Sequence, residues 1–252
     1  MMTYDIAAVT ETGKVRQTNQ DAYLVRTGAI NGQPAALLAV ADGMGGLSHG
    51  EIASGLAVGF MEQWWQAHSG AKGLAWNTIS ETLDAAIYEA HRQVYFYGEK
   101  LQKKTGTTLS LLFLSGRAYL LKQIGDSRIY LSQNGKTLQI TSDQTWRNEK
   151  IAEGALTPEE AANHYLSHAL TNAIGASTEL EIAAAEGEVQ GSAAFLLCSD
   201  GFYNGLPGLA ETAPWGGKNT AQKDLSGMLE KVLAGRASDN ITAVLCKIPR
   251  FL

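Results

Sequence analysis

One apolar run that ends abruptly in an acid sets the strongest limit on how this chain folds. Leu37 to Ala41 has the length and continuity of a strand buried on both faces, and it ends at Asp42 and Gly43. Glycines at 43, 45 and 46 allow the backbone to turn and become exposed. A carboxylate and a bare carbonyl are therefore expected at the edge of a core, although Asp and Gly are also common in ordinary turns.

Three further aspartates stand at comparable places. Asp126 follows the apolar run 118–121, Asp200 follows the run 195–198, and Asp239 directly precedes the run 241–245. If these strand ends converge, the four carboxylates gather negative charge that needs cations to offset it. The repetition favours a cation site over four unrelated turns.

Composition restricts the class of protein. The chain has 252 residues, of which 45% are hydrophobic, enough for one large domain or two small ones. We predict a single domain over residues 1–252. A net charge of −5 argues against a nucleic-acid partner, because phosphate backbones attract basic surfaces. No apolar run approaches the ~18 residues of a membrane span, so we expect a cytoplasmic protein with no membrane contact. We also expect the protein to be a monomer.

The rest of the pattern mixes short strands with amphipathic helices. Possible capping boxes at Ser48–Glu51 and Thr78–Glu81 predict the starts of two long helices. Segment 143–179 is predicted to be helical, and a last helix should cover about 220–234. Turn signals such as Asn134-Gly135 predict a mostly antiparallel meander. The expected strands are 4–9, 22–27, 107–114, 118–124, 128–132, 137–141, 181–189, 193–198 and 240–248.

Cysteine and histidine supply no convincing metal motif. The two cysteines, Cys198 and Cys246, fall inside apolar strands without the spacing of a zinc site, so buried thiols are expected. His164 and His168 stand four residues apart, which can bind a metal, but no further ligand stands near them.

Taken in order, seven short motifs resemble one known family, the metal-dependent serine/threonine protein phosphatases of type 2C in their short bacterial form. The resemblance covers nearly the whole chain and implies an α+β fold, a four-layer α-β-β-α sandwich of two mainly antiparallel sheets flanked by helix pairs. The motifs lie at 16–21, 40–46, 106–108, 125–128, 169–175, 198–201 and 238–240.

The resemblance also assigns roles to residues of this sequence. Asp42 resembles the carboxylate that bridges two metals, and Asp200 and Asp239 resemble further ligands of the first. Gly43 resembles the carbonyl ligand of the second metal, with Asp21 as an outer partner. Two other positions match family residues: Arg16 the one that holds the substrate phosphate, and Asp126 the acid that helps bind a third, weaker metal.

The residue types agree with this chemistry. Oxygen ligands select hard cations, so two tightly bound Mn²⁺ or Mg²⁺ ions are expected rather than zinc. Such a pair can acidify a water and hold the phosphoryl oxygens, so no protein nucleophile is required. The resemblance implies hydrolysis of phosphoserine and phosphothreonine on phosphorylated proteins, substrates of a bacterial-type serine/threonine kinase.

Some positions depart from the family pattern. Gln20 replaces an acid common in eukaryotic members, and Met44 replaces a histidine proposed there as general acid, which leaves the proton donor unassigned. Gln144, which follows Asp143, replaces a histidine that is common in the family. We interpret Asp143 as structural. The family has a mobile flap beside the active site at a place that matches segment 147–168.

Two alternatives stay open on the sequence alone. The first is a catalytically weak phosphoprotein-binding or regulatory module of the same fold, whose signature would be loss of the metal-binding acids. The second is a two-metal phosphodiesterase or nuclease, which uses the same chemistry but conflicts with the acidic balance of the chain.

Overall fold

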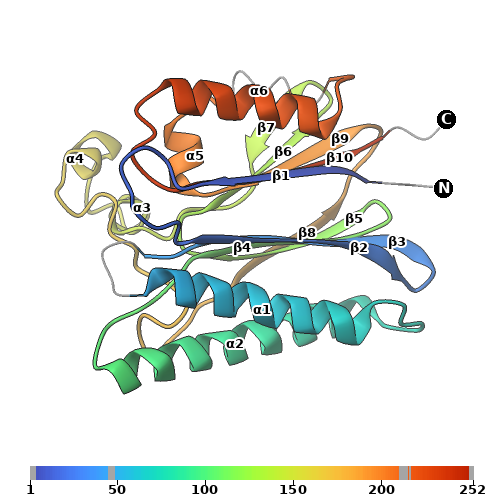
Figure 1. Ribbon diagram of the computed structural model, residues 1–252, viewed down its shortest axis with the longest axis horizontal. Coiled ribbons are helices and arrows are strands. Elements are labelled where there is room, and N and C mark those ends of the chain that lie inside the picture. The colour runs from blue at the N-terminus through green and yellow to red at the C-terminus, as the bar shows by residue number, and fades with distance from the viewer. Residues whose placement is uncertain (1–3, 45–48, 210–214, 216, 250–252) are drawn as a thin grey trace.

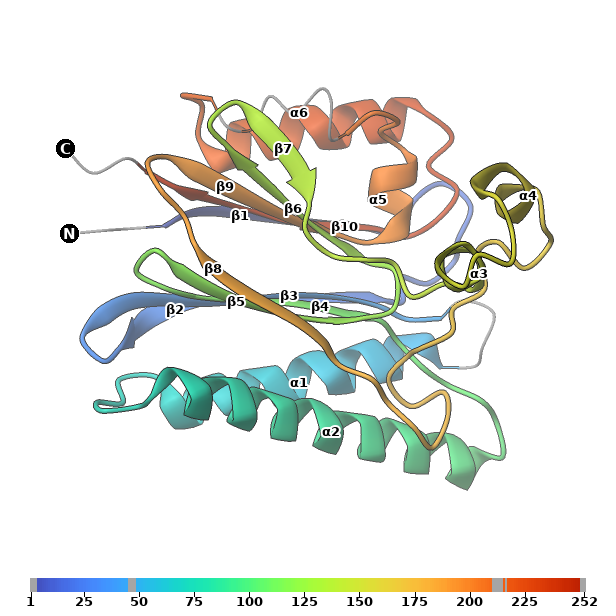
Figure 2. The same cartoon turned by 180° about the vertical axis from the view of Figure 1, so that it is seen from behind.

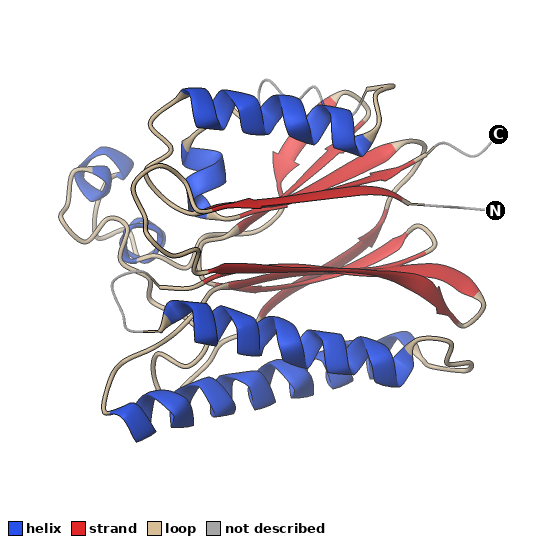
Figure 3. Cartoon of the chain, viewed as in Figure 1, coloured by secondary structure: helices blue, strands red, loops and turns tan. Residues whose placement is uncertain are grey.

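The fold is a sandwich of two β-sheets covered by helices on both outer faces. In this computed structural model the described residues are 4–44, 49–209, 215 and 217–249. Figures 1 and 3 show four layers, with α1 and α2 below one sheet and α5 and α6 above the other. Within the described residues, the strands of both sheets pair antiparallel throughout. The predicted α-β-β-α architecture is thus confirmed.

Each sheet has five strands, and we name each sheet after one of its inner strands. The β3 sheet has the order β2-β3-β4-β5-β8 and the β9 sheet has the order β1-β10-β9-β6-β7. In the β3 sheet the strands are β2 (Asp21–Ile30), β3 (Gln33–Asp42), β4 (Leu109–Ser115), β5 (Ala118–Ile124) and β8 (Ala183–Glu188). In the β9 sheet they are β1 (Asp5–Glu11), β10 (Ile241–Ile248), β9 (Ala193–Cys198), β6 (Arg128–Gln133) and β7 (Lys136–Gln139).

The chain leaves one sheet for the other between β5 and β6, which corrects the predicted meander. The strand β5 pairs with β4 and β8, whereas β6 pairs with β9 and β7. Gly125, at φ 86°, makes the turn, and a Cβ there would collide with Thr108. Strand propensity identified both strands but could not distinguish a hairpin from a crossover. Asp126 therefore lies between the two sheets.

Two long helices cover the β3 sheet. They are α1 (Gly50–His68) and α2 (Trp76–Leu101). The N-cap of α1 is His49, without a side-chain capping bond, and Ser48 of the predicted capping box lies outside the described residues. The prediction for α2 is wrong in detail, because the helix begins after Ala75 and Thr78 lies inside it. Its apolar face, including Ile79, still packs on the sheet as predicted.

Segment 143–179 is less helical than predicted. It contains only two short helices among its described residues, α3 (Trp146–Ala152) and α4 (Pro158–Ala162). The Thr157/Glu160 capping box and Pro158 start α4 as expected. Beyond α4, turns carry the chain back to β8, which is the edge strand beside β5 and lies on the near side of its sheet in Figure 2. Few of these residues are buried, so no wide apolar face stabilises a longer helix.

Helices α5 (Asp200–Asn204) and α6 (Ala221–Ala234) cover the β9 sheet. Thr220 caps α6, close to the predicted start of the last helix. Apolar side chains fill three layers: between α1/α2 and the β3 sheet, between the two sheets, and between the β9 sheet and α5/α6. Cys198 and Cys246 are buried free thiols, as predicted. Among the described residues, no helix is long and apolar enough to cross a membrane.

One side chain joins the two sheets at the end of the sandwich near the start of β1. The hydroxyl group of Tyr4, just before β1, lies 3.0 Å from the Pro34 carbonyl oxygen and 2.9 Å from that of Gly116. These carbonyls belong to the β2–β3 and β4–β5 ends of the opposite sheet. The contact ties the first strand of one sheet to two hairpins of the other.

Candidate active site

The predicted acids meet at the opposite end of the sandwich. Asp42 ends β3 directly opposite Asp21, which begins β2. Asp126 stands in the crossover between sheets, Asp200 begins α5 after β9, and Asp239 precedes β10. A cavity of about 290 Å³ brings together Asp42, Gly43, Asp126, Asp200, Asp239 and Arg16. The convergence proposed from four separate strand ends is therefore present in the fold.

Hydrogen bonds from the two threonines just before β4 hold the main chain of Asp42 in place. Its N–H donates to Thr108 Oγ1 at 2.9 Å, and its carbonyl oxygen accepts from Thr107 Oγ1 and from the Thr108 N–H, each at 2.9 Å. Thr108 Oγ1 also lies 2.7 Å from Ser127 Oγ, beside the crossover. The main chain of Asp42 is thus fixed while its carboxylate faces the cavity. The family resemblance includes the motif at 106–108 but does not assign this role to Thr107 and Thr108.

The grouped carboxylates disfavour one another's charge. Burial, reinforced by the charge on Asp200, raises the pKa of Asp126 to about 7 and that of Asp21 to about 6. The pKa of Asp42 lies well above its usual range because of burial and the charges on Asp21 and Asp200. Burial and the charge on Asp239 raise the pKa of Asp200. Positive charge that enters the cavity would favour the ionised forms of these acids.

Asp21 has one carboxylate oxygen that the protein does not satisfy. Its Oδ2 accepts a hydrogen bond of 2.9 Å from Ser199 Oγ, which joins the two sheets. Its Oδ1 is buried and has no hydrogen-bond partner among the described residues. An orphaned anionic oxygen inside an acidic cluster is suited to a cation.

Arg16 and Asp239, to which separate roles were assigned, form a two-point ion pair. Arg16 Nε donates to Asp239 Oδ1 at 2.8 Å and Arg16 Nη2 donates to Asp239 Oδ2 at 2.7 Å. Both side chains are partly exposed, at 41% and 35%. The described residues contain no three His, Cys, Asp or Glu side chains already arranged to hold a metal ion. Each carboxylate oxygen of Asp239 thus accepts one hydrogen bond from Arg16 in this structure.

The loop that carries Arg16 is held by one asparagine. Asn240 Nδ2 donates to the carbonyl oxygens of Thr12 and Thr18, at 2.9 and 3.0 Å, and Asn240 Oδ1 accepts from the Gln20 N–H. Gln20 in turn donates from Nε2 to Glu51 Oε2 at 3.1 Å. Asn240 was quoted as part of a motif, but only the structure shows that it places the Arg16 loop beside Asp239.

Gly43 lies where no side chain fits. A Cβ at this position would collide with the backbone oxygens of Gly50 and Gln20. The Gly43 N–H donates to the Gln20 carbonyl oxygen at 3.1 Å. This close approach brings the start of α1, the Arg16 loop and the end of β3 together, so a glycine is required on packing grounds alone.

Asp143 is used by the fold, as interpreted from the sequence. Arg128 donates to it from Nη2 at 2.6 Å and from Nε at 3.0 Å, and the guanidinium also stacks over the Tyr203 ring at 3.7 Å. Asp126 is not part of this ion pair, although it stands only two residues from Arg128. The carboxylate of Asp126 is therefore available to the cavity rather than committed to its neighbour.

The return of the flap-like segment closes one side of the cavity with His168, Ala169 and Leu170. The Trp146 N–H donates to the Ala169 carbonyl oxygen at 2.8 Å, and Thr145 forms a bridge with Leu170. The sequence placed a flap here but did not place His168 in the site. No motif marked that residue, because its position depends on how the segment turns after α4.

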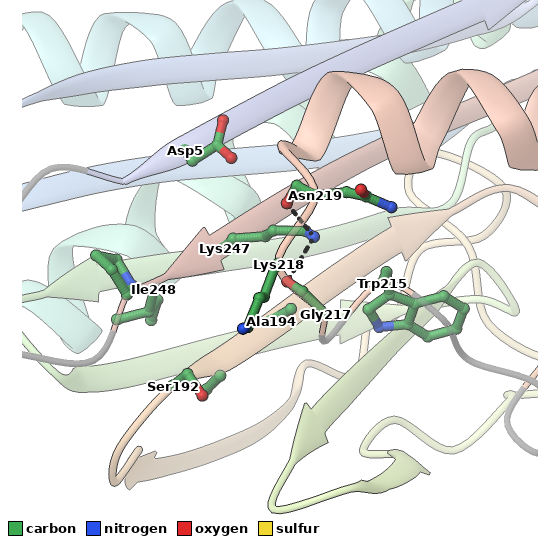
Figure 4. A pocket seen from close by; sticks show the side chains of 11 residues that line it. Asp5, Ser192, Ala194, Trp215, Gly217, Lys218, Asn219, Lys247 and Ile248 are labelled. Atoms are coloured by element: carbon green, nitrogen blue, oxygen red, sulfur yellow. Dashed lines mark hydrogen bonds between the residues drawn. The ribbon is translucent and has the colours of Figure 1, made fainter.

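A second cavity, shown in Figure 4, is lined by the buried ammonium group of Lys247, which has a structural role. It has a volume of about 360 Å³ and lies beside Asp5 and Ile248, at the end of β10 remote from Asp239. Lys247 Nζ donates to the Asn219 carbonyl oxygen at 2.8 Å and to Asp224 Oδ2 at 2.6 Å. Asp5 Oδ2 accepts from the Ala221 N–H at 2.8 Å. These charges fix the start of α6 to the sheet.

Comparisons with known proteins agree on one family. The profile described as protein phosphatase 2C matches residues 11–233. The chain is 30% identical over 238 residues to the serine/threonine phosphatase Stp of Listeria monocytogenes, covering 94% of this chain and 92% of that protein. A serine/threonine phosphatase structure from S. agalactiae has a TM-score of 0.84 at 26% identity, covering 97% of this chain and 99% of that one.

A third relative relates the fold to metal binding. The catalytic domain of the serine/threonine protein phosphatase PstP, solved in complex with two manganese ions, has a TM-score of 0.79. It is 29% identical, and the match covers 99% of this chain and 100% of that structure. The similarity extends over the whole sandwich rather than over isolated motifs.

Proposed function

Because this chain belongs to the protein phosphatase 2C family and is a serine/threonine protein phosphatase, we propose that it hydrolyses phosphoserine and phosphothreonine by direct attack of water at a centre of two divalent cations. The observation that carries this proposal is the convergence of Asp42, Asp126, Asp200 and Asp239 from both sheets on one cavity beside Arg16. No serine or cysteine nucleophile is needed for this chemistry.

The acidic cluster fits hard divalent cations. Its donors are all oxygens, the Asp21 Oδ1 atom has no partner among the described residues, and burial with mutual repulsion raises the pKa of Asp42. Oxygen ligands of this kind favour Mn²⁺ and Mg²⁺ over zinc. We propose that Asp42 bridges the two cations, with Asp200 and Asp239 on the first. The Gly43 carbonyl would serve the second, with Asp21 as its outer partner.

When bound, such a cation pair supplies an acidified water and positive charge for the phosphoryl oxygens. The protein residues would position these groups. Thr107 and Thr108 hold the main chain of Asp42, and Ser199 orients the Asp21 carboxylate by donating to Oδ2. Rigid placement matters, because effective catalysis needs reacting atoms held in a near-attack geometry.

Arg16 is proposed to bind the substrate phosphate. In the structure its guanidinium already makes two parallel hydrogen bonds to a planar carboxylate, that of Asp239. Phosphate offers the same two-point geometry, which a lysine cannot match. If Asp239 binds a cation and releases Arg16, the guanidinium becomes free for the substrate phosphate. This change of partner for Arg16 would couple cation binding to substrate binding.

We assign Asp126 to a third, weaker cation. It lies in the same cavity but comes from the crossover, and its nearest cation along the chain, Arg128, is committed to Asp143. Substrates are proposed to be proteins phosphorylated by a bacterial-type serine/threonine kinase. The working unit is proposed to be a monomer, since the acids and Arg16 all come from one chain.

The test is hydrolysis of a phosphothreonine peptide with the protein stripped by a chelator and then reloaded. We expect no turnover with chelator, recovery with Mn²⁺ or Mg²⁺, and a loss of at least about 10²-fold for Asp42→Asn, because a charged bridging ligand is removed. Glu230→Gln on the exposed face of α6 is the matched control and should keep full activity. Full activity in chelator, or an active Asp42→Asn protein, would contradict the two-cation assignment.

The same experiment separates the remaining alternative. A module that only binds phosphoproteins would retain the phosphopeptide in a binding assay without releasing phosphate under any cation. Turnover that depends on Mn²⁺ and on Asp42 rules this out. Preference for a phosphodiester over the phosphopeptide would instead support a nuclease-like activity.

A further inference from the structure

The catalytic cavity contains one imidazole that the proposed reaction has not used. His168 lines the cavity together with the carboxylates and Arg16. It is the only histidine among the cavity-lining residues, all of which the structure describes. His168 comes from the end of the flap-like segment (147–168) and is exposed where it lines the cavity.

The backbone around His168 is fixed while its ring is free. The N–H of Ser167 donates to the His164 carbonyl oxygen at 3.0 Å, and the N–H of Ala169 donates to the Leu166 carbonyl oxygen at 2.8 Å. Ser167 is buried, whereas His168 is exposed. Within the described part of the chain, the His168 ring has no hydrogen bond, ion pair or ring contact. Its nitrogens are therefore available to a ligand.

The nearby His164 provides the contrast. Its ring stacks on Trp146 with centroids 4.1 Å apart and an interplanar angle of 19°. Its Nδ1 accepts a hydrogen bond from the Leu166 N–H at 3.2 Å. This imidazole is part of the structure of the flap-like segment. Of the two histidines four residues apart, one is used by the fold and the other faces the catalytic cavity.

The reaction needs a proton that the other lining residues do not supply. Departure of a serine or threonine alkoxide is costly unless the oxygen is protonated as the bond to phosphorus breaks. Arg16 does not release protons in proteins. The cavity acids must be ionised to hold cations, and Met44 has no acidic proton. An imidazole is the side chain best suited to proton donation near neutral pH.

We propose that His168 is a catalytic residue that donates a proton to the leaving oxygen, an inference that rests on the proposed hydrolytic function. The attacking water forms the new bond to phosphorus through its oxygen and releases one proton to solvent. The bond from phosphorus to the serine or threonine oxygen breaks, and its electron pair stays on that oxygen. That oxygen takes the proton from a His168 ring nitrogen and leaves as the alcohol. The neutral imidazole is then reprotonated from solvent.

The experiment compares two leaving groups in the Mn²⁺-loaded protein. A phosphothreonine peptide releases an alkoxide that needs a proton, whereas p-nitrophenyl phosphate releases an anion that is stable near neutral pH. We expect His168→Gln to lower kcat for the peptide by about 10²-fold or more, the usual contribution of general acid catalysis. Hydrolysis of p-nitrophenyl phosphate should stay within about 2-fold, a contrast that a purely structural role would not produce.

Controls separate this idea from folding and from the proposed function. His168→Asn is the second variant, and thermal melting checks that each protein is folded. His164→Ala should lower the melting temperature and affect both substrates alike, because it removes the ring stack. Equal losses on both substrates, or no loss on the peptide, would overturn the role of His168. A wild-type protein inactive on both substrates with Mn²⁺ would instead refute the proposed function.

Discussion

Replacing Asp126 by Asn should stabilise the cation-free protein at alkaline pH while impairing catalysis. Asp126 is held between the two sheets, where burial and the charge on Asp200 raise its pKa to about 7. The folded state therefore keeps a proton on this carboxyl group over a pH range in which the unfolded chain has lost it. An amide of the same shape removes the cost of burying the charge but also removes the proposed ligand of the third cation.

The size of the effect follows from the shift. A rise from the ordinary value of 3.8 to about 7 corresponds to roughly 4 kcal/mol, at 1.36 kcal/mol for each pKa unit. The folded state binds more protons between these values, so its stability falls as pH rises from about 4 to 7 and stays low above. Asp126→Asn should remove this part of the decline.

The assay is urea unfolding at pH 5 and pH 8 in the presence of a chelator. The variant should be more stable than the wild type at both pH values, and its advantage should grow by up to about 3 kcal/mol from pH 5 to pH 8, where the rest of the decline takes place. Addition of Mn²⁺ should favour the wild type. Asp143→Asn is the matched control, because it breaks the ion pair with Arg128 and should destabilise at both pH values. A less stable Asp126→Asn protein at pH 8 would mean that the acid holds its turn.

Two further substitutions separate binding from folding. Arg16→Ala should raise the KM for a phosphopeptide about 10-fold or more, with Arg16→Lys restoring only part of it. The melting temperature should hardly change, since a partly exposed ion pair with Asp239 contributes about 0–1 kcal/mol to stability. A large fall in the melting temperature would instead make Arg16 a structural residue. Lys247→Met should lower the free energy of unfolding by about 3–5 kcal/mol, because Asp224 then stays buried without its cation. Its kcat under native conditions should stay unchanged, and loss of turnover without loss of stability would contradict the structural role.

The strand pattern revealed the ends of the strands better than their partners. Apolar runs located the strands that carry Asp42, Asp200 and Asp239, because burial on both faces leaves a continuous signal in sequence. The change of sheet at Gly125 could not be read, since a hairpin and a crossover use the same turn residues. The Thr78–Glu81 box failed because a capping sequence inside an established helix is overridden by packing.

The candidate site divides in the same way. The resemblance named the acids and Arg16, whose positions follow strand ends and short motifs. It could not show that Arg16 and Asp239 pair with each other, because both contacts are between segments more than 200 residues apart. His168 was also out of reach, since its approach to the cavity depends on turns that carry neither apolar periodicity nor a motif.

The Tyr4 contact gives the sandwich two mechanically different ends. At one end the Tyr4 hydroxyl holds two hairpins of the opposite sheet, while at the other end Asp21 and Asp42 of one sheet face Asp200 of the other with like charge. Cations there would act as a removable clasp between the sheets. Amide exchange should then quicken on chelation along the strand ends beside Asp42, whereas the hairpins at Pro34 and Gly116 keep their protection. Without cations, the two sheets would separate at the acidic end while they stay in contact at the Tyr4 end.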